Sequence, residues 1–443
     1  MTSRFKQWCA VITAVALIAG LLPSNIVWAQ FGGETAISSF VYPMNPQLEK
    51  LSLEVEHLAD NVLRRLGTYS VIDVERALSP EAIQENALRI NYARQSFDEG
   101  KQAFEALDLE TAQDKFLEAV AFYEQALGYL PADGSYETCL MYMGASAYMQ
   151  GDPTFAKEQL KKLVILAPDY QPDSSLFLPE VMDIFSEARS EVNNMPGGAL
   201  EITSNPPAVE VYVDGSYIGV TPITVPNLVA GEHLVVTSRK GYVRKGEIVK
   251  VSGAAKTTVV SRLTPTNNFR VLSASLTRAR GEFKQGVVGP GISELTRWLN
   301  LQEVVLGEVD FVNNQVIVNL ALFDIPSRKA LSVRQQQFPA ADPQIKVNID
   351  RFIETFISTA PAPGEVEVAR EMATMQEQAQ QYEELQRRKA EAEEPVTKKW
   401  WFWTVIGVGG AAVIGGAVVG IMFATKKDTT VEPSNKGALV IQY

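Results

Sequence analysis

The sequence predicts a multidomain α+β protein with α-helical repeats, a β-sandwich, a small α/β domain and a C-terminal transmembrane helix. Three observations lead to this prediction. The chain has 443 residues, more than one hydrophobic core normally holds. Residues 81–195 follow helical periodicity, whereas residues 197–265 change abruptly to short alternating runs separated by turns. Residues 400–424 form an uncharged run that is long enough to span a bilayer.

The chain begins with a pattern typical of a secretory signal peptide. Arg4 and Lys6 precede an apolar run over residues 8–22, and Pro23 ends that run. Residues 27–29 then provide a small-x-small cleavage pattern. We therefore expect residues 1–29 to be a signal peptide that is removed after export. An uncleaved membrane anchor is the alternative.

Residues 30–80 predict a βαβ segment, with strands at 38–42 and 69–74 around a helix at 48–66. One face of the helix carries its apolar residues at helical spacing, namely Leu51, Val55, Leu58, Val62 and Leu66. His57 lies beside Leu58 in the sequence, and we expect it on the exposed side of this helix.

Residues 81–195 repeat at an offset of 44 positions. Small residues in both copies would allow antiparallel helices to approach closely. The second copy resembles a tetratricopeptide repeat, and the residues that carry the resemblance are Gly144, Tyr148, Gly151, Asp152, Ala156 and Pro168. Leu163 departs from that family, and the long offset predicts an extended helix over 109–129. The resemblance implies a shallow partner-binding groove, and a generic helical bundle is the alternative.

Residues 197–265 predict a β-sandwich of short strands. The segment resembles a PEGA domain, a small module of bacterial envelope proteins, and the matching residues are Pro206, Ala208, Asp214, Gly215, Gly219, Thr221, Pro222, Gly231, His233, Gly241 and Tyr242. The tetrad that gives the family its name reads Pro-Pro-Ala-Val at 206–209 here. This departure weakens any binding role taken from the motif and leaves the expected fold unchanged.

Residues 266–360 predict an α/β domain with a helical stretch to about Asn300, three strands at 304–309, 316–323 and 331–338, and a helix at 343–357. The strands resemble the sheet portion of the periplasmic α/β domains of TolB and the curli secretion lipoprotein. Residues 30–80 resemble the missing front half of that fold. Either the two segments form one domain, split by the segments between them, or they are two independent domains.

We expect residues 361–399 to form a linker and a charged helix. Residues 400–424 would form the transmembrane helix, and residues 425–443 a tail. Trp400, Trp401 and Trp403 predict an interfacial aromatic belt. Gly416 and Gly420 form a Gly-x-x-x-Gly pair, which would allow a homodimer through this helix.

Two sequence signals disagree about the orientation of this span in the membrane. More basic residues precede the span than follow it, so the positive-inside rule alone would place the body in the cytoplasm. A cleavable signal peptide commits the chain between it and the span to export, and the span then acts as a stop-transfer segment. We therefore expect a single-pass inner-membrane protein with most of the chain in the periplasm. An outer-membrane anchor stays open.

The composition offers little for catalysis. The chain has a net charge of −12, two histidines and two cysteines, of which Cys9 lies in the signal region. A Cys/His zinc pattern and a Gly-x-Ser-x-Gly elbow are absent from the sequence. Residues 286–291 are glycine-rich but lack the Lys-Ser/Thr of a phosphate loop. We expect no catalytic residues, no cofactor, no metal and no nucleic acid, and we expect Cys139 to be an apolar core residue.

The sequence therefore predicts a non-enzymatic scaffold or adaptor that presents its helical repeats and β-sandwich to envelope proteins, which the sequence does not name. The alternative is a protein that binds peptidoglycan or another surface polysaccharide. Tyr212, Tyr217 and Tyr242 would be the aromatic residues that stack on sugar rings in that alternative.

Overall fold

The computed structural model describes residues 35–360 and residue 384. The expected signal peptide, linker, transmembrane helix and tail lie outside the described residues, apart from Glu384. The same is true of Trp400, Trp401, Trp403, Gly416 and Gly420. Within the described part of the chain, no helix combines the length and the apolar character that crossing a membrane requires.

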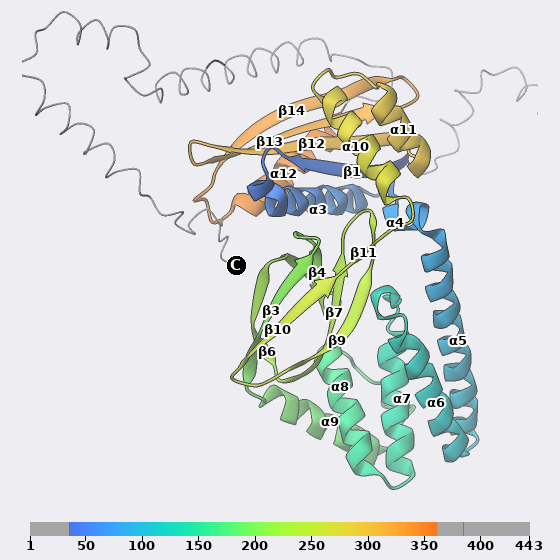
Figure 1. Ribbon diagram of the computed structural model, residues 1–443. Helices are drawn as coiled ribbons and strands as arrows, with labels where there is room; N and C mark the ends of the chain where they lie inside the picture. The colour runs from blue at the N-terminus through green and yellow to red at the C-terminus, as the bar shows by residue number, and fades with distance from the viewer. Residues whose placement is uncertain (1–34, 361–383, 385–443) are drawn as a thin grey trace, which may run out of the picture.

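The first and last described segments share one five-stranded sheet (Figure 1). Its strand order is β14-β13-β12-β1-β2. These strands are β1 (Thr35–Pro43), β2 (Tyr69–Val71), β12 (Glu303–Val312), β13 (Gln315–Asp324) and β14 (Lys329–Pro339). The central contact is parallel, with β1 paired to β12 from Ile37 opposite Glu303 to Pro43 opposite Val309. Residues 35–80 and 266–360 thus contribute to a single α/β domain, which the intervening segments interrupt.

Helices cover both faces of this sheet (Figure 1). One face packs on α3 (Glu49–Leu66) and α12 (Ile345–Ser358), and the other on α10 (Phe269–Phe283) and α11 (Pro290–Leu299). Alternating strand residues are buried against the two helix pairs, as the period of two requires. The domain is therefore a three-layered α/β/α structure.

One strand boundary in this domain differs from the sequence expectation, and the helical stretch that follows the sandwich is divided by a loop. The strand expected at 69–74 ends at Val71, because Asp73 accepts a hydrogen bond from the Glu75 amide (3.0 Å) and starts α4 (Val74–Leu78). The helical stretch expected to about Asn300 consists of two helices, α10 and α11, which are separated at the glycine-rich residues 286–289. The Glu282 carboxylate accepts the amides of Gly291 (2.6 Å) and Ile292 (2.8 Å) and so caps the second helix.

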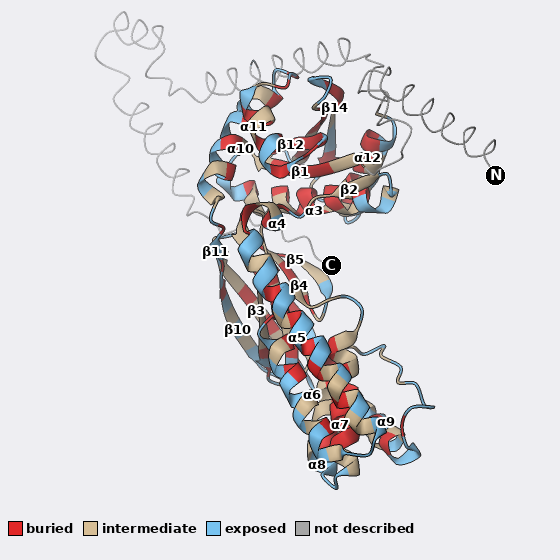
Figure 2. Cartoon of the chain, turned by 90° about the vertical axis from the view of Figure 1, so that its right-hand side faces the viewer, coloured by how far each residue is buried: buried red, intermediate tan, exposed pale blue. Residues whose placement is uncertain are grey.

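The helical region consists of two antiparallel hairpins and a fifth helix. The helices are α5 (Pro80–Glu105), α6 (Leu109–Glu124), α7 (Ser135–Met149), α8 (Pro153–Leu166) and α9 (Pro179–Asn193). Equivalent aspartates start the second helix of each hairpin: Asp108 accepts from the Thr111 amide (3.3 Å) and Asp152 from the Phe155 amide (3.0 Å). Figure 2 shows this region extending away from the α/β domain, with α5 reaching from α4 to the far end.

The two hairpins pack through glycine at equivalent positions. A Cβ on Gly100 would stand 2.7 Å from the Phe116 ring, and one on Gly144 would stand 2.9 Å from Leu160. The expectation of a helix over 109–129 was wrong, because α6 ends at Glu124 and a 3-10 turn, η2 (Leu127–Tyr129), follows. The extra length of the repeat belongs to the connection that reaches the β-sandwich.

Nine strands follow, and seven of them form two facing sheets with the orders β10-β3-β6 and β5-β4-β7-β9. The strands are β3 (Gly197–Asn205), β4 (Glu210–Val213), β5 (Ser216–Val220), β6 (Ile223–Val229), β7 (Gly231–Ser238), β8 (Tyr242–Val243), β9 (Lys245–Val251), β10 (Lys256–Arg262) and β11 (Thr264–Pro265). Inward residues of both sheets, such as Leu200 and Val235, share one core. The segment is a β-sandwich, as its alternating pattern predicted.

The backbones of η2 and β9 touch where the sandwich meets the helical region. A Cβ on Gly246 would stand 2.3 Å from the backbone nitrogen of Gly128. We expect Gly246→Ala to lower the free energy of unfolding by about 1–3 kcal/mol, because neither backbone can yield without disturbing its own element. Chemical denaturation of the full chain measures this. Gly281→Ala in α10 is the matched control, since its Cβ would meet nothing within 4 Å; an equal loss in both variants would contradict the contact.

Candidate functional site

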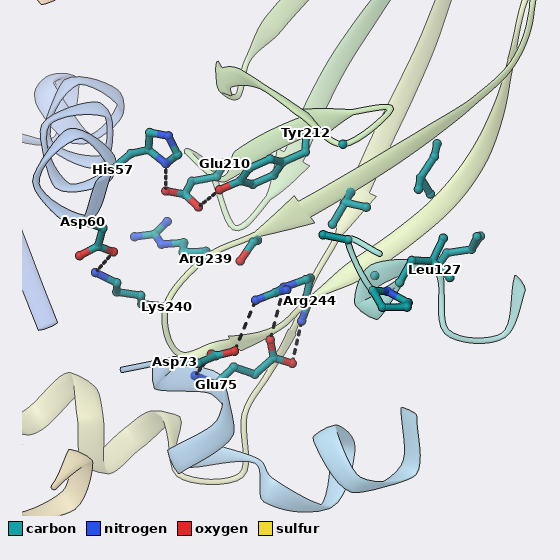
Figure 3. A pocket seen from close by; sticks show the side chains of 18 of the residues that line it. His57, Asp60, Asp73, Glu75, Leu127, Glu210, Tyr212, Arg239, Lys240 and Arg244 are labelled. Carbon is teal, nitrogen blue, oxygen red and sulfur yellow. Dashed lines mark hydrogen bonds and ion pairs between the residues drawn. The ribbon is translucent and has the colours of Figure 1, made fainter. Parts of the chain in front are cut away.

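The α/β domain, the helical region and the sandwich surround a cavity of about 490 Å³ that both charged and apolar side chains line (Figure 3). Helix α3 contributes one wall, strands β4 and β7 with the loop after β7 another, and the connection from η2 to α7 a third. The ionisable side chains that line it are Glu56, Asp60, Asp73, Glu75, Glu137, Glu210 and Asp214, with Arg64, Arg239, Lys240, Arg244 and His57. All three parts of the molecule therefore contribute ionisable side chains to one cavity.

Lys240 of the sandwich pairs with two carboxylates of the α/β domain. Its Nζ lies 2.8 Å from Asp60 Oδ2 and 3.2 Å from Glu56 Oε1, and it donates to the Ser39 carbonyl (2.7 Å). Ser39 in turn donates to Asp60 (2.6 Å), and Glu56 accepts from the Val41 amide (2.8 Å). The loop after β7 is thus bound to both β1 and α3.

Burial and pairing act in opposite directions on the pKa values of this cluster. Burial raises the pKa of Glu56, and the Lys240 ammonium opposes that rise. Burial would lower the pKa of Lys240, but the Asp60 and Glu56 carboxylates outweigh it and raise that pKa. Lys240 therefore stays charged, and its charge is what compensates the two carboxylates.

Glu75 joins all three parts of the molecule at a second point. It is 5% exposed, it accepts the Arg244 amide (3.0 Å), and it accepts the hydroxyl of Tyr129 from η2. The Arg244 guanidinium lies 3.6 Å from Asp73, so one sandwich residue bridges two acids of the α/β domain (Figure 3). Burial raises the pKa of Glu75 although Tyr129 and Arg244 oppose it.

His57 was expected on the exposed side of its helix, and this expectation was wrong. The residue is 6% exposed because the sandwich covers that side of α3. Its Nδ1 lies 3.0 Å from Glu210 Oε1, its Nε2 lies 2.8 Å from the Asn61 amide nitrogen, and its ring stacks on Tyr217 with 3.5 Å between ring centroids. Tyr212 donates to the same Glu210 (3.2 Å). The apparent surface histidine is an interdomain contact.

The sandwich residues singled out from the sequence are mainly structural. His233 is buried between Asp214 (2.6 Å) and the Val229 carbonyl (2.7 Å); burial would lower its pKa, but Asp214 raises it. Thr221 accepts the Val209 amide (2.9 Å). The remaining motif residues occupy turns, tight contacts and strand ends: Pro206, Ala208, Gly215, Gly219, Pro222, Gly231, Gly241 and Tyr242. Only Asp214 and Gly215 of the motif line the cavity.

A comparison with known protein families gives a match to the sandwich segment. The family model of the PEGA domain matches residues 198–267. No curated protein matches the chain significantly. The match covers only this part of the chain, and it supports the sequence assignment of the sandwich. The PEGA domain is thus the part whose loop carries Arg239, Lys240 and Arg244 into the junction.

The residues singled out in the helical region lie away from the cavity. Gly144 and Ala156 are buried between α7 and α8, and Tyr148 is half-buried. Gly151 has a φ of +87° in the turn before Asp152, and Pro168 is exposed after α8. These residues build the hairpin. Cys139 is fully buried in the same core, where burial raises the pKa of its thiol.

Carboxylates pair with most of the basic side chains that line the cavity. Arg239 pairs with Glu49 (2.7 Å). With Lys240 and Arg244, three of the four basic side chains that line the cavity therefore pair with carboxylates of the α/β domain. Among the described residues, no group of three or more potential ligands is placed to hold a metal ion. Sequence reasoning missed Glu56, Asp60, Glu75, Lys240 and Arg244. For Glu56 and Asp60, the available signal is the polar series Ser52, Glu56 and Asp60, spaced by four along α3, which indicates a polar contact on that face of the helix.

Proposed function

We propose that this protein is a non-enzymatic, membrane-anchored periplasmic scaffold or adaptor. The observation that carries the proposal is the junction, where ion pairs and a tyrosine hydrogen bond join the α/β domain, the helical region and the PEGA domain. A body held in this way presents surfaces from three parts in a fixed relation, which is what an adaptor needs. The partners would be other envelope proteins.

The helical region is the first candidate for partner contact. Its two hairpins, with matched aspartate caps and glycine contacts, favour the tetratricopeptide-like interpretation. Apolar side chains stay exposed on them, with Leu88 49% and Tyr92 52% exposed on α5. Exposed aromatic and aliphatic residues on one helix are typical of protein contacts. The location rests on the signal-peptide pattern at residues 1–29 and the apolar run at 400–424.

These contacts favour the scaffold over the polysaccharide-binding alternative. The Tyr217 ring is covered by His57, and Tyr242 packs on Phe269 with ring centroids 4.9 Å apart. Tyr212 meets Tyr217 edge to face at 5.4 Å. A sugar needs an accessible aromatic face, and the three candidate rings are engaged within the protein.

Site-specific photocrosslinking in intact cells tests the proposal. A photoreactive phenylalanine analogue would replace Tyr92 in the full chain, and Val347 on α12, which is 55% exposed, would be the matched control position. We expect a discrete protein adduct from position 92 that Leu88→Glu weakens. No adduct from position 92, together with sedimentation of the purified full chain with cell-wall sacculi, would contradict the scaffold and favour polysaccharide binding.

A further inference from the structure

The connection between α8 and α9 places a single side chain in the core of the helical region. Within its residues 171–178, which we call the strap, only Phe177 is buried. Phe177 is 8% exposed, whereas its neighbours Leu176 and Leu178 are 55% and 47% exposed. The strap therefore lies on the molecule with one ring inserted and two leucines facing solvent.

The Phe177 ring enters an aromatic cluster that three helices build. It meets the Tyr142 ring of α7 edge to face, with 5.0 Å between the ring centroids. Three further rings, from α5 and α6, lie 5.5–5.8 Å from that of Tyr142, namely those of Phe97, Phe104 and Phe116. Such edge contacts favour an aromatic guest over an aliphatic one of similar size. The cluster is thus a seat for one aromatic ring, and the strap supplies that ring.

Few polar contacts hold the strap in place. Among the described residues, every backbone–backbone hydrogen bond of the strap either stays inside it or joins Leu178 to the first turn of α9. The Asp173 carboxylate is also used internally, since it accepts the Ser175 amide (2.9 Å). The connection from α6 to α7 differs, because residues 126–128 are buried there and meet the backbone of β9. A segment with one buried side chain and little backbone pairing opens locally at low cost.

We propose that the strap is an autoinhibitory segment, and that an extended segment of a partner protein displaces it by inserting an aromatic side chain into the same cluster. The seated segment shows the chemistry of the guest: a phenylalanine whose ring leaves water while its aliphatic neighbours stay at the surface. The inference deepens the proposed scaffold function and rests on it, because the guest belongs to a partner.

The tether explains why the strap would act as an inhibitor. Both of its ends are fixed, by α8 and by α9, so the Phe177 ring is held close to its seat at a high effective concentration. A partner can bind only to the fraction of molecules in which the strap is open, and its apparent affinity falls by that fraction. Weakening the seat of Phe177 should therefore tighten binding in trans.

Fluorine NMR titration of the full chain in lipid nanodiscs tests this. The probe is a capped peptide of residues 170–180 that carries 4-fluorophenylalanine at the position of Phe177. We expect Phe177→Ala to bind the probe about tenfold more tightly than the parent chain, because its strap no longer competes. Phe177→Leu keeps an apolar side chain in the core and so safeguards folding. It should bind the probe about threefold more tightly than the parent chain.

Unlabelled peptides show whether the cluster recognises the ring. The peptide with alanine in place of Phe177 should not displace the probe from either variant. The peptide with alanine in place of Leu176 should displace it, since this leucine is exposed in the strap. In the chain itself, Leu176→Ala is the matched control and should bind the probe as weakly as the parent does.

Equal displacement by the two peptides, or equal affinity of the parent and both Phe177 variants, would overturn the proposal. A dimer of the parent chain in sedimentation that Phe177→Leu disrupts would overturn a partner protein as the source of the ring and identify a second copy instead. The photocrosslink from position 92 distinguishes this inference from the proposed function. If that adduct forms while the Phe177 variants bind no probe, the scaffold stands and the autoinhibitory strap fails.

Discussion

Lys240→Met is expected to lower the free energy of unfolding by about 3–5 kcal/mol, the loss that follows when one partner of a buried ion pair is removed. The substitution keeps the aliphatic stem but leaves Glu56 and Asp60 facing each other without a cation, and both are less than 9% exposed. Denaturant titration of the full chain, followed by circular dichroism, measures the change.

Two further variants show whether the loss comes from this cluster. Lys250→Met removes an exposed lysine of the same domain, and it should change stability by less than about 0.5 kcal/mol. The triple variant Lys240→Met, Glu56→Gln, Asp60→Asn should recover part of the loss, because it removes the uncompensated charges together with the lysine. An unchanged stability of Lys240→Met would contradict the description of the junction.

Glu303→Gln is expected to stabilise the protein at pH 8 and to flatten its dependence on pH. Burial, with Asp324 opposite on the neighbouring strand, raises the pKa of Glu303 from 4.5 to about 7. Between these values the folded protein holds a proton that the unfolded chain has released, so stability falls as pH rises through this window. The shift corresponds to about 3 kcal/mol, all of which weakens the folded state above pH 8.

Unfolding free energies at pH 5 and pH 8 check this expectation. The stability difference between Glu303→Gln and the parent should be larger at pH 8 by about the stated amount. Glu180→Gln, an exposed acid on α9, is the control and should show no such change. A difference that stays the same at both pH values would mean that Glu303 is ionised in the folded protein throughout.

Local patterns predicted much of the fold. Helix α3 and the three strands of the last segment follow their apolar spacing to within a few residues. The Asp-Gly turn at 214–215 and the equivalent caps at Asp108 and Asp152 likewise depend on neighbours in the sequence. Such features are set by backbone conformation and by contacts a few residues apart, which a single sequence shows directly.

The junction could not be predicted in the same way. Glu56 and Lys240 meet only because the split domain brings β1 and α3 against the PEGA loop, and nothing near either residue indicates the other. His57 illustrates the error: one apolar face on α3 suggested an exposed opposite face, whereas a second domain covers it. The Ser52, Glu56 and Asp60 series indicates a polar contact and leaves its partner unknown.

The most direct test of the account is the side of the membrane on which the body lies. One tag would be inserted after Ala29 and another after Tyr443 of the full chain, and intact spheroplasts would be treated with protease. The account predicts that the front tag is digested while the tail tag survives, since the body would be periplasmic and the tail cytoplasmic. Survival of the front tag with loss of the tail tag would contradict the account and place the body and its partners in the cytoplasm.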